Sequence, residues 1–154
     1  MTRVYRNLSY LVAAVVAGQL AALAYAVAGL RQWVADGGEL YESIMDNAAQ
    51  WLPEGAGFTI HGVSERIVLP AIAVLLLATS FRTITPAATR WAVGICLLVS
   101  AQVGLGLLSQ SVPAAGGLYG AGALLLAGMA VHTGRRSIGW TVTSPGAAPA
   151  GSGR

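Results

Sequence analysis

The chain has 154 residues, of which 55% are hydrophobic and only 10% are charged. A soluble domain usually has about 25% charged residues, so this composition excludes an ordinary water-soluble protein. The net charge of +3 rests on nine arginines and no lysine. These arginines are spread along the chain, which excludes a nucleic-acid-binding face as the reason for the basic charge. Length and composition therefore predict a single polytopic membrane domain.

Four apolar segments are long enough to cross a bilayer, which requires about 20 helical residues. We expect membrane helices at about residues 8–30, 58–81, 91–108 and 112–132. Short connections join the last three, so these helices should be antiparallel neighbours. The predicted fold is an all-α integral membrane protein, an antiparallel four-transmembrane-helix bundle over residues 1–137. A disordered cytoplasmic tail, rich in Gly, Pro, Ser and Ala, is expected over residues 138–154.

Small residues recur four apart along these segments, a spacing that favours close helix packing. The pairs are Ala14 with Gly18, Ala22 with Ala26, Ser100 with Gly104, and Gly116 with Gly120. In a chain so rich in Ala and Gly, composition alone explains such pairs equally well. If the faces are used, they suit contact with other membrane subunits or with a second copy of the chain, and both alternatives stay open.

The connection between the first two spans, about residues 31–57, contains an amphipathic pattern. Between about residues 39 and 52, apolar side chains recur at helical spacing. A helix this short cannot span a bilayer and should lie at the surface. Its acidic face favours a lid or a docking surface over adhesion to anionic lipid, with a passive interfacial helix as the alternative. The expected docking residues are Leu40, Tyr41, Ile44, Met45 and Trp51.

Charge placement predicts the orientation in the membrane. One set of predicted helix ends carries only basic residues, namely Arg3, Arg6, Arg82, Arg90, Arg135 and Arg136. The opposite ends carry all six acids and only Arg31 and Arg66. The positive-inside rule therefore predicts a bacterial plasma-membrane protein with both termini cytoplasmic and the 31–57 loop extracytoplasmic.

Polar side chains are few within the spans, where such residues usually face the bundle interior. They are Gln19, Tyr25, His61, Ser64, Glu65, Gln102 and Tyr119. At about 1.5 Å per residue, most of them fall at similar depth in the outer leaflet, with Gln19 nearer the middle. The apolar run 67–81 is too short to cross alone, so the stretch HGVSER should belong to the second membrane helix. Pro70 is expected to kink that helix.

His61 and Glu65 are four residues apart, so they share one helix face. A carboxylate in this position can orient an imidazole and raise its basicity. The pair is interpreted either as a ligand-binding or proton-handling site or as a purely structural polar contact. Cys96 is expected to be a buried packing residue. The sequence lacks the motifs of soluble enzymes, and its two histidines near opposite membrane faces argue against a protein-only zinc site, so no enzyme activity is predicted.

Two stretches carry a family resemblance: FTIHGVSERIVLPAIAVLLLATSFR, and the segment from WAVGICLLVSAQVGLGLLSQSVP to the end of the fourth span. Over about residues 3–137 the chain resembles half of the haem A synthase architecture. It also resembles the small actinobacterial four-helix membrane proteins of uncharacterised function (the DUF6220 type). In haem A synthase-like bundles, one His on the second helix and one on the fourth can ligate haem. The resemblance implies that His61 is the first ligand, whereas Tyr119 stands where the second His is expected.

Three functions follow as hypotheses. The first is a non-catalytic subunit or accessory factor of a bacterial membrane complex, for example a respiratory one, with the lipid bilayer and other membrane subunits as partners. The second is a redox protein that binds haem b or a quinone in the outer half of the bundle through His61, Glu65, Tyr119 and Gln102. The third is a small transporter or channel, which the nearly apolar cytoplasmic half of the spans disfavours.

Overall fold

The computed structural model describes residues 2–39, 52–83 and 85–139, with side chains up to 138. Within these ranges the protein is all-helical and has no strand. Four helices are long and apolar enough to cross a membrane. They are α1 (Thr2–Ala35), a composite second helix (Pro53–Ser80), α6 (Pro86–Leu108) and α7 (Pro113–Gly139). The expected all-helical chain with four apolar spans is confirmed.

Helix α1 is longer than its predicted span at both ends. Its 34 residues correspond to about 51 Å of helix, well beyond the roughly 30 Å of a bilayer core. It ends in a Schellman motif, in which the Gly38 amide donates to the Trp33 carbonyl (2.9 Å) and Gly37 adopts a φ of +90°. Only glycine adopts this φ without strain, so the Gly37 position fixes the end of α1.

The second membrane helix consists of three segments with different hydrogen-bonding patterns. A 3₁₀ turn (η1, Pro53–Gly55) leads into α4 (Ala56–Val63), a π-helical segment follows (η2, Ser64–Val68), and α5 (Leu69–Ser80) completes the span. The stretch HGVSER is therefore helical, as the sequence predicts. The Leu69 amide donates to the Ser64 carbonyl, five residues back. Pro70 follows directly and lacks an amide hydrogen, so a π turn lies where the sequence led us to expect a kink.

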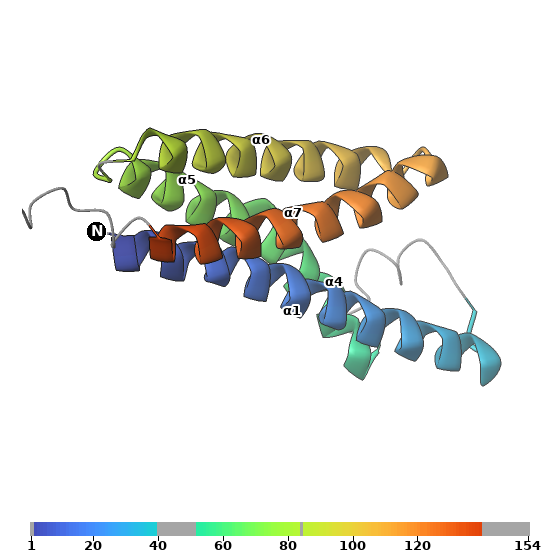
Figure 1. The fold of residues 1–154 in the computed structure, drawn as a ribbon. Coiled ribbons are helices and arrows are strands. Elements are labelled where there is room, and N and C mark those ends of the chain that lie inside the picture. Colours follow the sequence, from blue (N-terminus) through green and yellow to red (C-terminus); the bar gives the residue numbers. More distant parts are fainter. Residues whose placement is uncertain (1, 40–51, 84, 140–154) are drawn as a thin grey trace, which may run out of the picture.

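The helices form a ring in which each contacts its chain neighbours, and α1 closes the ring against α7 (Figure 1). The part of the second helix that lies far from the N-terminus of the chain departs from this pattern. The backbone of α5 lies near both α1 and α6, whereas the backbone of α4 lies near α1 but not near α6 or α7. Figure 1 shows α4 crossing behind α1 at the end of the bundle where α6 and α7 diverge from α1. The π segment η2 lies where α4 separates from α6 and α7, a place called the fork below, and it contacts α6 as well as α1.

The apolar core fills the half of the bundle that contains the N-terminus. Its fully buried members come from all four membrane helices and include Val12, Val16, Leu76, Ile95 and Leu126. At the same end, the Tyr5 hydroxyl donates to the Ala88 carbonyl (2.9 Å) and ties α1 to the start of α6. Cys96 is only partly buried and donates from its thiol to the Ala73 carbonyl (3.3 Å), so it acts as a packing residue between α6 and α5.

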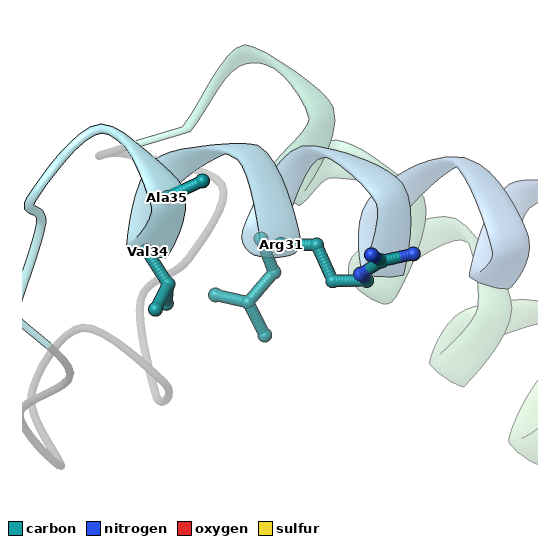
Figure 2. A pocket seen from close by; sticks show the side chains of 4 residues that line it. Arg31, Val34 and Ala35 are labelled. Atoms are coloured by element: carbon teal, nitrogen blue, oxygen red, sulfur yellow. The ribbon is translucent and has the colours of Figure 1, made fainter.

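The opposite end of α1 borders a pocket of about 370 Å³ (Figure 2). The side chains that line it are Leu30, Arg31, Val34 and Ala35, all from the last turns of the helix. The predicted outer helix and its docking residues Leu40, Tyr41, Ile44, Met45 and Trp51 lie outside the described residues. So does the predicted tail beyond Gly139, while residues 138 and 139 belong to α7.

Candidate functional site

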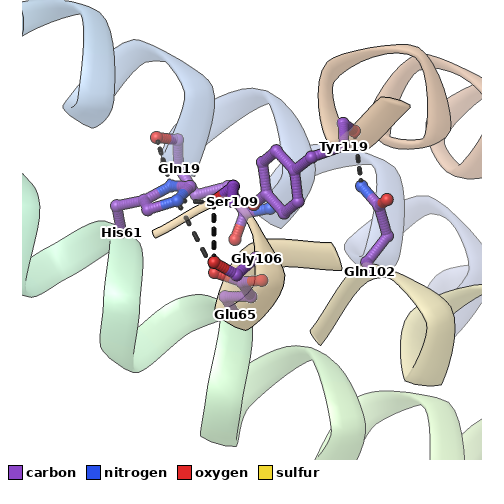
Figure 3. Close-up of polar contacts among 7 residues, drawn as sticks. All are labelled: Gln19, His61, Glu65, Gln102, Gly106, Ser109 and Tyr119. Atoms are coloured by element: carbon purple, nitrogen blue, oxygen red, sulfur yellow. Dashed lines mark hydrogen bonds and ion pairs between the residues drawn. The ribbon is translucent and has the colours of Figure 1, made fainter. Parts of the chain in front are cut away.

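Three membrane helices bring their polar side chains together at the fork. His61 projects from α4 and Glu65 from the π segment η2, and the His61 Nε2 and Glu65 Oε2 atoms lie 3.6 Å apart. Both side chains are largely buried, with 15% and 8% of their surfaces exposed. The sequence spacing of four residues therefore does place imidazole and carboxyl group on one helix face, and that face points into the bundle (Figure 3).

Both ring nitrogens of His61 have a polar partner on another helix. Its Nδ1 lies 3.3 Å from the backbone carbonyl oxygen of Gln19 on α1. Its Nε2 lies 3.4 Å from the hydroxyl oxygen of Tyr119 on α7, and the two rings meet edge to face at 75° with centroids 5.9 Å apart. A single imidazole thus connects α4 to both α1 and α7, although α4 has no backbone proximity to α7.

Glu65 packs against helix α6 at a glycine. A Cβ at position 106 would overlap the Glu65 carboxyl group, so a larger residue there would force that group to shift from its place between η2 and α6. The Tyr119 hydroxyl, which lies 3.4 Å from His61 Nε2, is also next to this carboxyl group. The Oε1 atom of Glu65 is buried and has no hydrogen-bond partner among the described residues. Glu65 is therefore positioned by shape on one side and by polar contacts on the other.

Gln102 lies behind Tyr119 and makes no contact with His61. Its side-chain amide donates from Nε2 to the backbone carbonyl of Tyr119 (3.0 Å), while its Oε1 lies against Gly122, where a Cβ would overlap it. The sequence placed Gln102 in the site as a ligand opposite His61. The structure gives it a different position, in which it ties α6 to α7 and supports the backbone that carries Tyr119.

Tyr25 is predicted at the depth of the cluster but does not join it. Its side chain is 57% exposed, and His61 lies against Gln19, which the sequence places nearer the middle of the membrane than Tyr25. Both the level of the cluster along α1 and the direction of Tyr25 around the helix axis therefore differ from the prediction. Conversely, sequence reasoning missed Gly106, Gly122 and the Gln19 carbonyl. The two glycines could have been suspected as places where a polar side chain packs closely, because small residues lie near Gln102 in the sequence. The Gln19 carbonyl could not, because no side-chain pattern identifies a backbone carbonyl as a histidine partner.

The fit of a haem can be tested on His61 and Tyr119. Two ligands on opposite sides of one iron hold their donor atoms about 4 Å apart, with metal–ligand bonds of roughly 2 Å each. The Nε2 and hydroxyl oxygen atoms lie 3.4 Å apart in direct contact, and both ring nitrogens of His61 are already engaged. This arrangement does not fit a haem between the two side chains, and binding there would require α4 to move away from α7. In the described part of the chain, no group of three His, Cys, Asp or Glu side chains forms a metal site either.

Comparisons with protein-family models, with curated proteins and with solved structures give no match for this chain. The resemblance to four-helix membrane families therefore stays a prediction, and the site is interpreted from its own geometry.

Proposed function

We propose that this chain is a non-catalytic subunit or accessory factor of a bacterial membrane complex, in which the polar cluster locks the outer half of the bundle. Each member of the cluster contacts another helix of the same chain: His61 reaches α1 and α7, Glu65 reaches α6 and α7, and Gln102 reaches α7. Such contacts support a structural role, because polar side chains in a membrane stabilise helix association when they find partners.

The observation that carries the proposal is that one small-residue pair on α1 packs against another helix of the chain, whereas a second pair is exposed. Ala22 and Ala26 receive Gly57 of α4, where a Cβ would overlap the Ala22 carbonyl. Ala14 and Gly18, two turns away, are exposed, and a Cβ at position 18 would meet nothing within 4 Å. The same spacing that brings α4 against α1 is therefore also present on the outer face, where it suits a helix of another chain.

Co-purification from native membranes in a mild detergent, followed by mass spectrometry, tests this role. We expect a second membrane protein to co-elute in stoichiometric amount with the wild-type chain. Gly18→Leu should lose it, because the larger side chain separates the two helices. Leu124→Ile, at an exposed position on α7, is the matched control and should retain it. A wild-type chain that elutes alone, or only with copies of itself, would contradict the proposal.

The orientation belongs to the same proposal. We place both termini in the cytoplasm and the 31–57 loop outside a bacterial plasma membrane. The arginines Arg3, Arg6, Arg82, Arg90, Arg135 and Arg136 support this placement, since they lie at the bundle end that holds the N-terminus (Figure 1). Reporter enzymes fused after residues 37 and 139 should show periplasmic and cytoplasmic activity, respectively. The reverse result would overturn the orientation.

A redox protein is the second candidate function, favoured by one observation. Glu65, Gln102 and Gln19 each have a buried Oε1 atom without a hydrogen-bond partner among the described residues. Hydroxyl groups of a reduced quinone could donate to such oxygens, whereas haem b would require His61 to be released. Solvent extraction of the purified protein tests for quinone. A Soret band after haem-supplemented expression that collapses in His61→Ala would support haem b, and a colourless preparation would count against it.

A further inference from the structure

The hydrogen positions in the polar cluster can be deduced from what each atom is able to donate. His61 Nδ1 faces the Gln19 carbonyl oxygen at 3.3 Å. A carbonyl oxygen only accepts hydrogen bonds, so the Nδ1 atom must carry the proton of this contact. In a neutral imidazole the other nitrogen, Nε2, is then a lone-pair acceptor.

This assignment creates a conflict on the other side of the ring. Nε2 faces Oε2 of Glu65 at 3.6 Å and the hydroxyl oxygen of Tyr119 at 3.4 Å. If the imidazole is neutral and the carboxylate is ionised, Nε2 and Oε2 are both acceptors and no proton lies between them. Tyr119 has one hydroxyl proton and can donate it to only one of the two.

One additional proton removes the conflict. On Nε2 it is donated to Oε2, while the Tyr119 hydroxyl also donates to the carboxylate. On Oε2 it is donated to Nε2, and the Tyr119 hydroxyl donates to the carboxyl group as before. The two arrangements contain the same atoms and the same number of protons. They differ only in which partner holds the shared proton, and both have zero net charge.

The surroundings of Glu65 make the neutral arrangement the favourable one. An isolated carboxylate within a membrane-spanning helix is costly unless a cation or several donors compensate it. From α1 the cluster is faced by Gln19, from α6 by Gly106 and from α7 by Tyr119, none of which is charged. Arg66 is the next residue in sequence, and its positive charge acts on the carboxyl group although its side chain is exposed. His61 is the group in direct contact with the carboxylate that can take up a compensating proton.

We infer that His61, Glu65 and Tyr119 form a proton-binding site, which holds one proton between Nε2 of His61 and the carboxyl group of Glu65. The ligand is a proton taken from solvent, and its binding involves no oxidation or reduction. The inference goes beyond the accessory role, because it rests on the interior of the bundle and not on any partner. A failed co-purification would leave it untouched.

Magnetic resonance of the full-length chain in lipid nanodiscs tests the site at pH 7. The chain has two histidines, so His132→Gln leaves His61 as the only one. Nitrogen-15 labels on histidine and carbon-13 labels on the glutamate carboxyl groups then report every exchangeable proton of the His61 ring and the Glu65 carboxyl group. We expect two protons over Nδ1, Nε2 and the Glu65 carboxyl group, with one of them on Nδ1. A neutral His61 next to an ionised Glu65 would overturn the inference, as would an Nδ1 without a proton.

Glu65→Gln provides the second arm and also identifies the Glu65 signal. The introduced amide can donate to Nε2 without any additional proton, so His61 should be neutral with its proton on Nδ1. Glu54→Gln is the matched control at the same end of the bundle, and it should leave the His61 signals unchanged. A His61 that stays doubly protonated in Glu65→Gln would show that the carboxyl group is not the partner, and would overturn the inference. If Glu65→Gln does not fold, the proton count of the parent chain decides alone.

Discussion

The two halves of this bundle are held together by different means. The half with the N-terminus buries aliphatic side chains from all four helices, and its arginines lie outside the core. The other half buries His61, Glu65 and Gln102, which fit against glycines and carbonyl groups. Aliphatic packing tolerates exchange between residues of similar volume. A polar contact at a glycine tolerates much less, so specificity should be concentrated in the half with the polar cluster and stability in the half with the N-terminus.

The largest effect is expected in the inner core. Leu76→Ala removes a fully buried side chain of α5 and should lower the free energy of unfolding by about 2–3 kcal/mol, chiefly through lost packing. Unfolding of the detergent-solubilised protein by a denaturing detergent measures it. Leu75→Ala, at a neighbouring position with 55% exposure, should cost little. Equal losses in both variants would show that the inner core is not packed as described.

Gly106→Ala tests the half of the bundle with the polar cluster, because it adds one methyl group next to Glu65. Its Cβ overlaps the Glu65 carboxyl group, and the expected cost is about 1–2 kcal/mol. Gly104→Ala on the same helix meets nothing within 4 Å and should be neutral or slightly stabilising, because alanine favours the helix. The same denaturation assay compares the two. Combining Gly106→Ala with Glu65→Ala should cost less than the sum of the single changes, and simple additivity would refute the contact.

Tyr119→Phe removes one hydroxyl group and keeps the ring in place. The hydroxyl lies 3.4 Å from His61 Nε2 and next to the Glu65 carboxyl group, so its loss should cost about 0.5–1.5 kcal/mol. A double-mutant cycle with Glu65→Gln should give a coupling energy of at least about 0.5 kcal/mol. Tyr10→Phe, on an exposed part of α1, serves as the control. No coupling would mean that the tyrosine only packs.

The smallest effect is expected for the exposed arginines at the inner end. Arg135→Gln combined with Arg136→Gln should change the free energy of unfolding by less than about 0.5 kcal/mol, because exposed charges contribute little to stability. The reporter fusions described above should keep their activities, since Arg3, Arg6, Arg82 and Arg90 remain. An inverted topology in this double variant would show that the two arginines of α7 alone determine the orientation of the chain.

Much of the fold was predictable because membrane spans are recognised by length and apolarity alone. The helices extend beyond the predicted spans, since α1 continues to Ala35 and α7 to Gly139 with residues that are not apolar enough to count as membrane-spanning. The pairing of His61 with Glu65 followed from their spacing, and Tyr119 was found by depth. The Gly106 contact and the Gln19 carbonyl could not be predicted, because they depend on how each helix is rotated about its axis. Tyr25 illustrates this limit: it is 57% exposed, and the cluster meets α1 at Gln19, six residues earlier.

The π segment at Ser64–Val68 has a consequence for changes in chain length. A π turn uses about one residue more than an α turn for the same rotation. Deleting one residue within Ser64–Val68 other than Glu65 should therefore convert the segment to an ordinary α-helix and leave Gly57 facing Ala22 and His61 facing the Gln19 carbonyl. Deleting one residue within α5 would have no such turn to absorb it and would rotate α4 by about 100° away from α1. Chains that differ by one residue in the π segment can therefore share the polar cluster, whereas chains that differ by one residue in α5 cannot.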